Sequence, residues 1–446
     1  MDRRSFLTAL GTLAGTAAWS PWSQAAGAGD YKALVAVFLY GGNDANNTLV
    51  PLDATRYAQY ATARGPLALA QSSLLPLVDA SGSAHYGLHP ALGGASGLQG
   101  LWDRSRLAWV ANVGPLVVPT TRAQVLANSV PLPANLYSHI DQQHAWESAE
   151  ASGGATTGWG GRLLDQISAL NSAALVPPLV SLAGTNLYLT AQATRSLALP
   201  ETGSFGLSGF GTGSADVLRR ATLSQLLGVD RSATLVGAAD DALQGAIAST
   251  ATIGPILSAA TASVDAAFAG LSGHFAAQLG RVARLIEARA SLGVRRQVFL
   301  VSLGSFDTHT DQLATQQSLY TELGAGLSAF HAAMDGIGIG NGVTSFTFSD
   351  FSRTLKPNST GGTDHAWGGH HLVAGGAVRG RSVYGTFPTL VLGGPDDAGS
   401  EGRFVPTTAT DQYAATLGAW FGLSAAQQAA AFPHVGQYAS PTLGFI

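Results

Sequence analysis

The sequence predicts an α/β fold in which a mostly parallel sheet is flanked by helices and carries a helical insertion. Three observations predict it. Short, continuous apolar runs recur along the chain, and several end at glycine. Stretches with the apolar spacing of helices lie between these runs. A stretch rich in Ala, Leu and Gln interrupts that alternation between about residues 203 and 290, and we interpret it as the insertion.

The apolar runs are the predicted strands. They are continuous in hydrophobicity and do not alternate between apolar and polar residues, which is typical of parallel strands buried on both faces. In chain order they cover residues 33–40, 107–113, 178–183, 297–303, 344–348 and 389–392.

The helical patterns complete this alternation. Residues 158–170, 313–334 and 411–421 have helical spacing, and Gly203–Gly213 is a Gly/Ser loop that leads into the insertion. Strands that alternate with helices favour parallel pairing, and ligands of such sheets bind beyond the carboxyl ends of the strands.

The N-terminus has the features of an export signal. A twin-arginine motif (Arg3-Arg4-Ser5-Phe6-Leu7) precedes a short apolar stretch, and Ser23-Gln24-Ala25 resembles a small-x-small cleavage site. We therefore expect residues 1–25 to be a twin-arginine signal peptide, handled by the Tat export machinery, and residues 26–446 to form the mature domain. That domain is expected in the periplasm or outside the cell.

Composition excludes several kinds of site and partner. Of 446 residues, 46% are hydrophobic and 11% are charged, which indicates a globular protein. Cysteine is absent, so disulfides and thiolate ligands are excluded and any metal must be held by nitrogen and oxygen atoms. The net charge is -4 and no basic stripe is present, so we expect no nucleic-acid partner. No second run is long and apolar enough to predict a transmembrane segment in the mature chain.

Polar motifs follow three predicted strands. Asp44 follows the first strand, where an isolated Asp is more often a helix cap or turn residue. Asp307 and His309 would share one face of an extended segment, either as half of a metal site or as a hydrogen-bonded pair without metal. Residues 363–371 add a second Asp-His pair, Asp364 and His365, and two further histidines, His370 and His371, in a glycine-framed loop. Such clustering favours metal binding.

A fourth polar segment begins at Tyr137-Ser138-His139 and has helical spacing through Trp146. Ser138 is a candidate N-cap of that helix. It is also a candidate nucleophile, because the N–H groups at a helix N-terminus favour an anion. Thr48 is the competing hydroxyl, since it lies four residues from Asp44.

The order of these motifs resembles a family of twin-arginine-exported bacterial proteins, catalogued as domain of unknown function 1501 within the alkaline phosphatase-like superfamily. The resemblance rests on Gly-Gly-x-Asp, the Ser-His segment, Asp-x-His and Thr-Asp-His-x-Trp-Gly, with the closing segment Gly402-Arg403-Phe404-Val405-Pro406. It implies two metal sites. One would use Asp44, Asp364 and His365; the other would use Asp307, His309 and either His370 or His371, with Ser138 between the two metals as nucleophile.

The resemblance implies a metal-dependent hydrolase of phosphate or sulfate esters, with a small-molecule or polymeric substrate. One or two Zn or Mn ions suit carboxylate and imidazole ligands. A formylglycine sulfatase is excluded, because no Cys or Ser heads the x-Pro-x-Arg pattern. Four residues are candidates for binding the anionic oxygens: Asn46, Asn47, His139 and Arg353. The alternative is a non-catalytic exported binding or assembly protein that keeps the fold.

Overall fold

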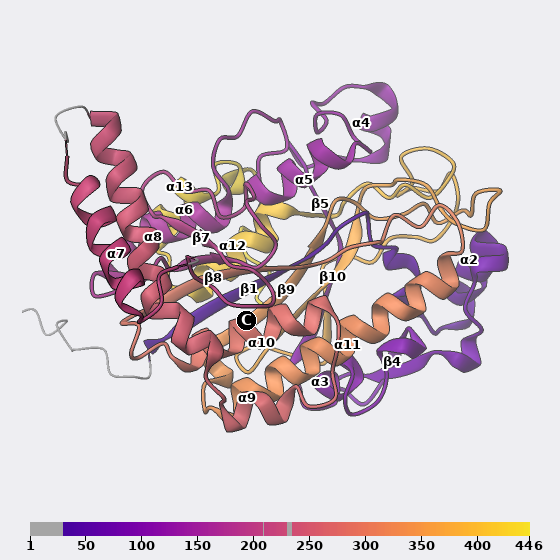
Figure 1. Ribbon diagram of the computed structural model, residues 1–446. Helices are drawn as coiled ribbons and strands as arrows, with labels where there is room; N and C mark the ends of the chain where they lie inside the picture. The colour runs from indigo at the N-terminus through magenta and orange to yellow at the C-terminus, as the bar shows by residue number, and fades with distance from the viewer. Residues whose placement is uncertain (1–29, 208, 230–233) are drawn as a thin grey trace, which may run out of the picture. The chain divides into compact units, whose positions relative to one another are not determined.

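The computed structural model describes residues 30–207, 209–229 and 234–446, and residues 32–446 form one compact unit. The signal peptide expected at residues 1–25 lies outside the described residues. The unit is built on a nine-stranded sheet with strand order β11-β5-β10-β9-β1-β8-β6-β7, and β12 pairs with β5 (Figure 1). The predicted α/β class is confirmed.

The centre of the sheet is parallel. β1 (Lys32–Leu39) pairs in parallel with β8 (Arg296–Leu303) and β9 (Val343–Ser349), and β8 continues to β6 (Leu179–Ser181) and then β7 (Ser196–Ala198). On the other side, β10 (Gly369–Gly375) runs antiparallel to both β9 and β5 (Leu107–Gly114). Two short strands, β11 (Ser382–Tyr384) and β12 (Thr408–Ala409), lie parallel to β5. A separate three-stranded sheet contains β2 (Leu49–Pro51), β3 (Leu75–Val78) and β4 (Ala84–Leu88).

Helices cover both faces of the large sheet (Figure 1). On one face, Leu34, Ala36 and Phe38 of β1 pack into a buried cluster with Trp146 and Trp159. That face carries α5 (His139–Ser148), α6 (Trp159–Gln166), α12 (Thr410–Phe421) and α13 (Ala425–Ala431). The other face carries α3 (Leu98–Asp103), α9 (Ala262–Ala267), α10 (His274–Glu287) and α11 (Gln312–Gly336).

The remaining helices lie outside these two layers. They are α2 (Ala54–Arg64), α4 (Arg122–Ala127), α7 (Ser214–Leu226) and α8 (Thr234–Ser258). No described side chain of α7 is buried, and α8 buries only Ser249 and Ile253 among the described residues. By contrast, α10 buries ten residues and contacts β8. The predicted insertion therefore divides: α7 and α8 lie outside the core, whereas α10 is part of a core layer.

Five of the six predicted strands are present, and one prediction is wrong. Residues 389–392 form no strand. Leu390 is buried against Val50, Tyr60 and Leu74, so this segment is apolar because it packs against the small sheet and α2, not because it pairs with another strand. The predicted polar loop at 363–371 also differs, because residues 369–371 begin β10.

Candidate metal centre

The loops that follow β1, β8 and β9 meet at the carboxyl edge of the parallel strands. The two glycines after β1 make this possible. Gly41 and Gly42 have φ of 111° and 88°, and a Cβ on Gly41 would lie 2.5 Å from the backbone nitrogen of Asp307. On Gly42 it would lie 2.4 Å from the Phe351 ring. Glycine favours this backbone conformation, and only a residue without a Cβ allows this close approach.

Four of the predicted ligands converge there. The His309 Nε2 atom lies 3.0 Å from Asp307 Oδ1 and 3.1 Å from His365 Nε2. The His365 Nε2 atom is 3.3 Å from the same Asp307 oxygen. On its other side, His309 Nδ1 is 3.2 Å from Asp364 Oδ1. Asp307, His309, Asp364 and His365 therefore form one cluster, although 55 residues separate His309 from Asp364.

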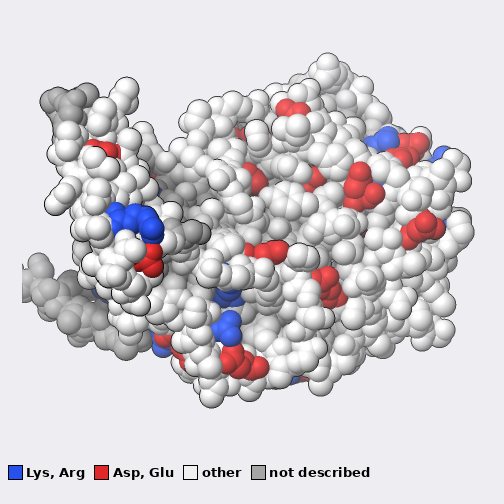
Figure 2. All heavy atoms as spheres, in the orientation of Figure 1, with Lys and Arg blue, Asp and Glu red and all other residues white. Residues whose placement is uncertain are grey.

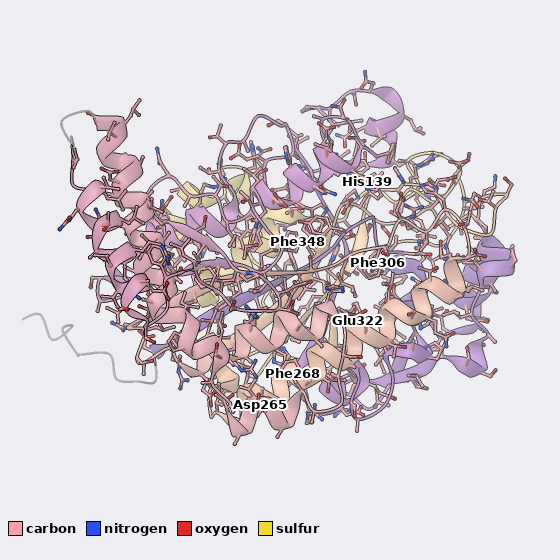
Figure 3. All side chains as sticks on the ribbon, viewed as in Figure 1. His139, Asp265, Phe268, Phe306, Glu322 and Phe348 are labelled. Carbon is pink, nitrogen blue, oxygen red and sulfur yellow. The ribbon has the colours of Figure 1, made fainter. Side chains whose placement is uncertain are left out.

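His139 joins this cluster from the first turn of α5, and Figure 3 labels this residue on the ribbon. Its Nε2 atom lies 3.6 Å from Asp307 Oδ2. One ligand atom from each of His139, Asp307 and His365 lies within 4.8 Å of the others, a spacing that allows a shared metal ion. The sequence predicts a substrate-binding role for His139, whereas the geometry puts its Nε2 atom among the candidate metal ligands.

Asp350 is a member of the site that no sequence motif predicted. Its carboxylate is fully buried, accepts a hydrogen bond from the Gly41 N–H at 3.1 Å, and lies 2.6 Å from His139 Nδ1. Gln143 donates to it at 2.9 Å. The available signal was its position two residues after the strand predicted at 344–348, beyond the carboxyl end of a parallel strand, where ligands bind.

The hydrogen bonds fix which nitrogen of each imidazole is available. The Nδ1 of His139 faces the Asp350 carboxylate, and the Nδ1 of His365 lies 2.8 Å from the Tyr137 carbonyl oxygen. Both acceptors require an N–H at Nδ1, so in the neutral rings the Nε2 lone pairs point into the cluster. Histidines that ligate metals are commonly held in this way, by a carboxylate or carbonyl on the second nitrogen.

Two Nε2 atoms at 3.1 Å, as in His309 and His365, repel each other unless a proton or a cation lies between them. The donor set therefore fits a divalent ion that prefers nitrogen and oxygen ligands, such as Zn or Mn.

Burial and neighbouring charges raise the pKa of some cluster residues and lower the pKa of others. Burial raises the pKa of Asp307, but the hydrogen bond and charge of Arg353 outweigh it, so the pKa lies below its usual value. The Asp350 hydrogen bond raises the pKa of His139. Burial is the largest influence on His365 and lowers its pKa. Asp307 is therefore held as the carboxylate.

The sequence predicts that Arg353 binds substrate oxygens, but in the site this side chain bonds to other parts of the protein. Its side chain is fully buried. The guanidinium donates to Asp307 Oδ1 at 2.5 Å, to the Gly41 carbonyl at 3.3 Å and to the Thr363 backbone and hydroxyl oxygens. Its role is to hold Asp307 and the Thr363 segment.

The predicted first metal site is wrong in one residue, Asp44. Its side chain is buried and forms an ion pair with the buried Arg64 guanidinium. Gln312 and the Asn46 N–H occupy further positions on the same carboxylate. A metal ion would be repelled by Arg64 and would have to displace these hydrogen bonds. Asp44 therefore orders the loop after β1 and is not placed as a ligand.

The other polar residues of this loop are also used within the protein. The Asn46 amide donates to the Arg353 carbonyl, and Asn47 bonds to Leu67, Tyr60 and Arg64. The Thr48 hydroxyl donates to the Asp44 carbonyl at 3.2 Å and contacts Tyr320. All three side chains are buried. Their predicted roles, in substrate binding for Asn46 and Asn47 and as a competing nucleophile for Thr48, do not fit these positions.

His370 and His371 are not brought into the cluster, because they lie within β10 and not in a loop. The His370 ring stacks on Phe387, and its Nδ1 accepts a hydrogen bond from the Asn112 N–H. The His371 ring packs against Trp146. Burial lowers the pKa of both histidines to about 3, so both are neutral core residues.

Ser138 occupies the N-cap position of α5, as the sequence indicated. Its neighbours both touch the site, since the Tyr137 carbonyl meets His365 and the His139 ring meets Asp307 and Asp350. The Ser138 hydroxyl itself donates to Asp141 at 2.6 Å. Its role as nucleophile stays a prediction.

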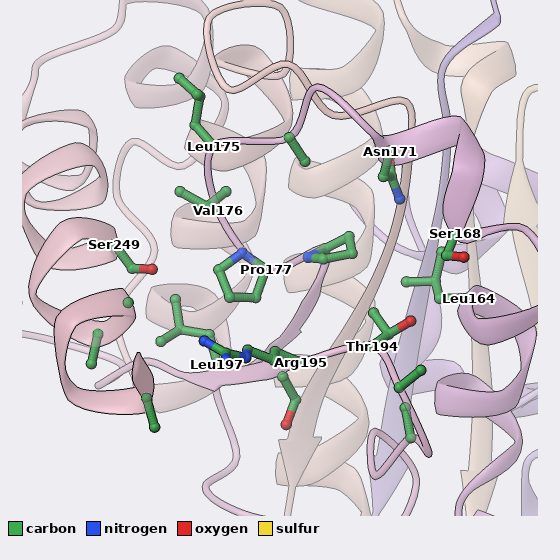
Figure 4. A pocket seen from close by; sticks show the side chains of 18 of the residues that line it. Leu164, Ser168, Asn171, Leu175, Val176, Pro177, Thr194, Arg195, Leu197 and Ser249 are labelled. Carbon is green, nitrogen blue, oxygen red and sulfur yellow. The ribbon is translucent and has the colours of Figure 1, made fainter. Parts of the chain in front are cut away.

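A cavity of about 920 Å³ lies elsewhere, between the segments leading into β6 and β7 and the helix α8 (Figure 4). Among the described residues that line it, Arg195 is the one that carries a charge, and the cluster residues are not among them. On the face shown in Figure 2, charged residues are scattered and form no continuous basic track. Among the described helices, none combines the length and apolar character needed to cross a bilayer.

Residues 31–397 match a family model described as Protein of unknown function (DUF1501). A search of curated proteins found no match. Among solved structures, the lipoteichoic acid synthase LtaP from Listeria monocytogenes is 10% identical, with a TM-score of 0.33, over 90% of this chain and 74% of that one. Ps i-CgsB, solved in complex with k-i-k-neocarrahexaose, is 8% identical, with a TM-score of 0.30, over 89% and 74%. Similarities of this size carry no inference about activity.

Proposed function

Because the chain belongs to the DUF1501 family, whose function is unknown, we propose its activity from the site itself: an exported metal-dependent hydrolase of phosphate or sulfate esters. The observation that carries the proposal is the convergence of ligand atoms from His139, Asp307 and His365 within 4.8 Å. The three residues come from α5 and from the loops after β8 and β9. Such convergence of distant imidazole and carboxylate groups is typical of a metal centre.

The ligand set differs from the one that the resemblance implies. We propose that His139, Asp307 and His365 hold a Zn or Mn ion and that His309 lies beside them, with its Nδ1 against Asp364. A divalent ion bound there would act as a Lewis acid on an ester oxygen and favour the deprotonated form of an attacking hydroxyl or water. Asp44 is excluded from the set by Arg64.

The chain's own residues have distinct tasks in this proposal. Asp350 orients His139, and the Tyr137 carbonyl orients His365. Arg353 keeps Asp307 ionised, so that it can serve as a ligand. The side chains of Asp307, His309 and Asp364 are 43% to 47% exposed, which gives an ester direct access from solvent. Ser138 is the proposed nucleophile because it is the hydroxyl of the segment that borders the cluster.

One observation favours a second candidate function. Arg353 already neutralises Asp307, so the cluster could be a structural network in a non-catalytic binding or assembly protein. In that case the histidines would be satisfied by the hydrogen bonds of the folded chain alone. Metal content separates the two candidates.

The test combines metal analysis with an ester screen. Wild-type protein dialysed against Zn or Mn should retain about one ion per chain, and His365→Ala and Asp307→Asn should lose it. A panel of phosphate and sulfate mono- and diesters should reveal turnover by the loaded wild type and none by His365→Ala. Ser138→Ala should keep the metal and lose turnover. Wild-type protein that retains no ion would overturn the metal centre and leave the non-catalytic candidate.

A further inference from the structure

We propose that Arg403 and Tyr137 form a clamp that sets the orientation of the His365 imidazole, which makes Arg403 a positioning residue of the metal centre. The inference rests on the proposed function and extends it to the closing segment Gly402–Pro406, which contains Arg403 and supplies no metal ligand. Arg403 lies 38 residues after His365 in the chain.

The first half of the clamp is the Tyr137 carbonyl. It accepts the hydrogen bond from His365 Nδ1 at 2.8 Å and so directs Nε2 toward Asp307 and His309. The carbonyl reaches this position because Tyr137 has φ of 75°, in the left-handed region that residues other than glycine rarely adopt. A bulky aromatic residue stays in that conformation only when its surroundings hold it there.

The second half of the clamp is the Arg403 side chain. Its guanidinium lies over the Tyr137 ring, with 5.1 Å between Cζ and the ring centroid. Its Nε donates to the His365 backbone carbonyl at 2.9 Å. A single planar group therefore holds both the residue that aims the imidazole and the backbone that carries it. Arginine suits this task because it can stack on a ring and donate in its own plane.

Arg403 is itself held in place. Its Nη1 pairs with Glu401 at 2.6 Å, and its backbone N–H donates to the fully buried Asp397 carboxylate at 3.1 Å. That carboxylate also accepts backbone N–H bonds from Gly393, Gly399 and Gly402. The loop that presents Arg403 is thus fixed by four hydrogen bonds to one buried side chain.

The consequence is specific to metal affinity. Without Arg403, the Tyr137 segment and the His365 backbone lose their shared partner, and the imidazole can rotate away from Asp307. Hydrogen-bonded partners of metal ligands typically change metal affinity by roughly 10- to 100-fold when removed. The fold should persist, because the Arg403 side chain is only partly buried, at 29% exposure.

The experiment compares Arg403→Ala and Arg403→Lys with Arg122→Ala. Arg122 is a matched control, since its Nε donates to the Asp397 backbone carbonyl of the same loop and does not touch His365. Each protein is stripped of metal, its thermal midpoint is measured, and it is titrated with Co²⁺, with the visible absorption spectrum recorded. Zn²⁺ affinity is then obtained by competition with a chromophoric chelator.

Arg403→Ala should bind Zn²⁺ roughly 10- to 100-fold more weakly than wild type and show an altered Co²⁺ spectrum, at a similar metal-free midpoint. Arg403→Lys keeps the charge but not the planar group, so it should also bind more weakly. Arg122→Ala should match wild type. If Arg403→Ala fails to fold, Arg403→Lys carries the test. Wild-type affinity and spectrum in a folded Arg403 variant would overturn the clamp. A wild type that binds no metal would overturn the proposed function as well.

Discussion

At the scale of single residues, Asp350 determines which ring nitrogen of His139 faces the cluster. A histidine on the first turn of a helix can turn its ring in several directions, and either nitrogen can carry the proton. The buried Asp350 carboxylate removes that freedom by accepting from Nδ1, and Gln143 and the Gly41 N–H hold the carboxylate in turn. The ligand is thus defined by a residue that does not itself face the proposed ion.

Asp350→Asn should weaken metal binding while preserving the side-chain volume. An asparagine has no negative charge and can present its NH₂ group to His139, so the Nδ1–H arrangement is no longer enforced. We expect a loss of affinity of roughly 10- to 100-fold in a competition titration with Zn²⁺. Asp335→Asn is the control, because Asp335 forms an exposed pair with Arg106 far along α11. Equal affinity of the two variants would contradict the role of Asp350.

Breaking the buried ion pair between Asp44 and Arg64 should lower the free energy of unfolding markedly. Both side chains are almost completely inaccessible, at 1% and 0% exposure, so Arg64→Ala leaves a buried carboxylate without its cation. Breaking such a pair typically costs about 3–5 kcal/mol. The pair between Asp53 and Arg56 is 46% and 37% exposed, and Arg56→Ala should cost less than about 1 kcal/mol. Denaturant unfolding of both variants measures the difference, and similar midpoints would argue against this assignment of Asp44.

At the scale of elements, the helix α12 carries a buried carboxyl in its first turn. Burial raises the pKa of Asp411 to about 7, against the lowering effect of its backbone hydrogen bonds and of Arg162. One oxygen of this side chain has no hydrogen-bond partner among the described residues. The helix N-terminus favours the carboxylate, but the loss of hydration outweighs that effect here.

Stability should therefore fall with rising pH because of Asp411. Its folded pKa lies above its ordinary value, so the folded state binds the proton more tightly than the unfolded state. The related stability is present below about pH 4 and is lost as the pH rises through about 7. Asp411→Asn should increase the free energy of unfolding at pH 8 by on the order of a few kcal/mol, since each pKa unit corresponds to about 1.4 kcal/mol. Urea unfolding at pH 4 and pH 8 checks this, and a gain of the same size at both values would contradict it.

Hydrophobic patterns were sufficient to predict some of the strands but not others. The strands β1, β8 and β9 were predictable because strands buried on both faces need continuous hydrophobicity. β10 was not predictable, because the sequence Gly369-His370-His371 is polar and indicates a loop. In the structure both histidines are buried, against Phe387 and Trp146. Residues 389–392 were predicted as a strand and form none. A segment that packs into a core without pairing needs the same apolar residues as a buried strand, so the two cannot be told apart by hydrophobicity.

At the scale of the whole molecule, the candidate centre joins segments that are far apart in the chain. A ligand that binds only the folded state stabilises it, by about 2.7 kcal/mol when the free ion is at 100 times its dissociation constant. Removal of metal with EDTA should therefore lower the thermal midpoint by on the order of a few degrees, and Zn or Mn should restore it. His365→Ala should respond to neither treatment. A wild type whose midpoint is unchanged by EDTA and by added metal would contradict a bound ion.

The sequence by itself determined the α/β class and five strands of the large sheet, because these depend on local hydrophobicity. It expected Asp307 and His309 to share one face of an extended segment, but β8 ends at Leu303 and the loop after it brings the two side chains together. It also drew attention to the segments after the strands, where Asp364 and His365 lie. Only the tertiary structure decided which polar residues meet. Arg64 comes from α2 and takes Asp44 out of the candidate ligands, whereas α5 brings in His139 and Asp350 fixes its ring. The physical reason is that a buried charge must find a partner, and the partner is set by how distant elements pack, which no local pattern records.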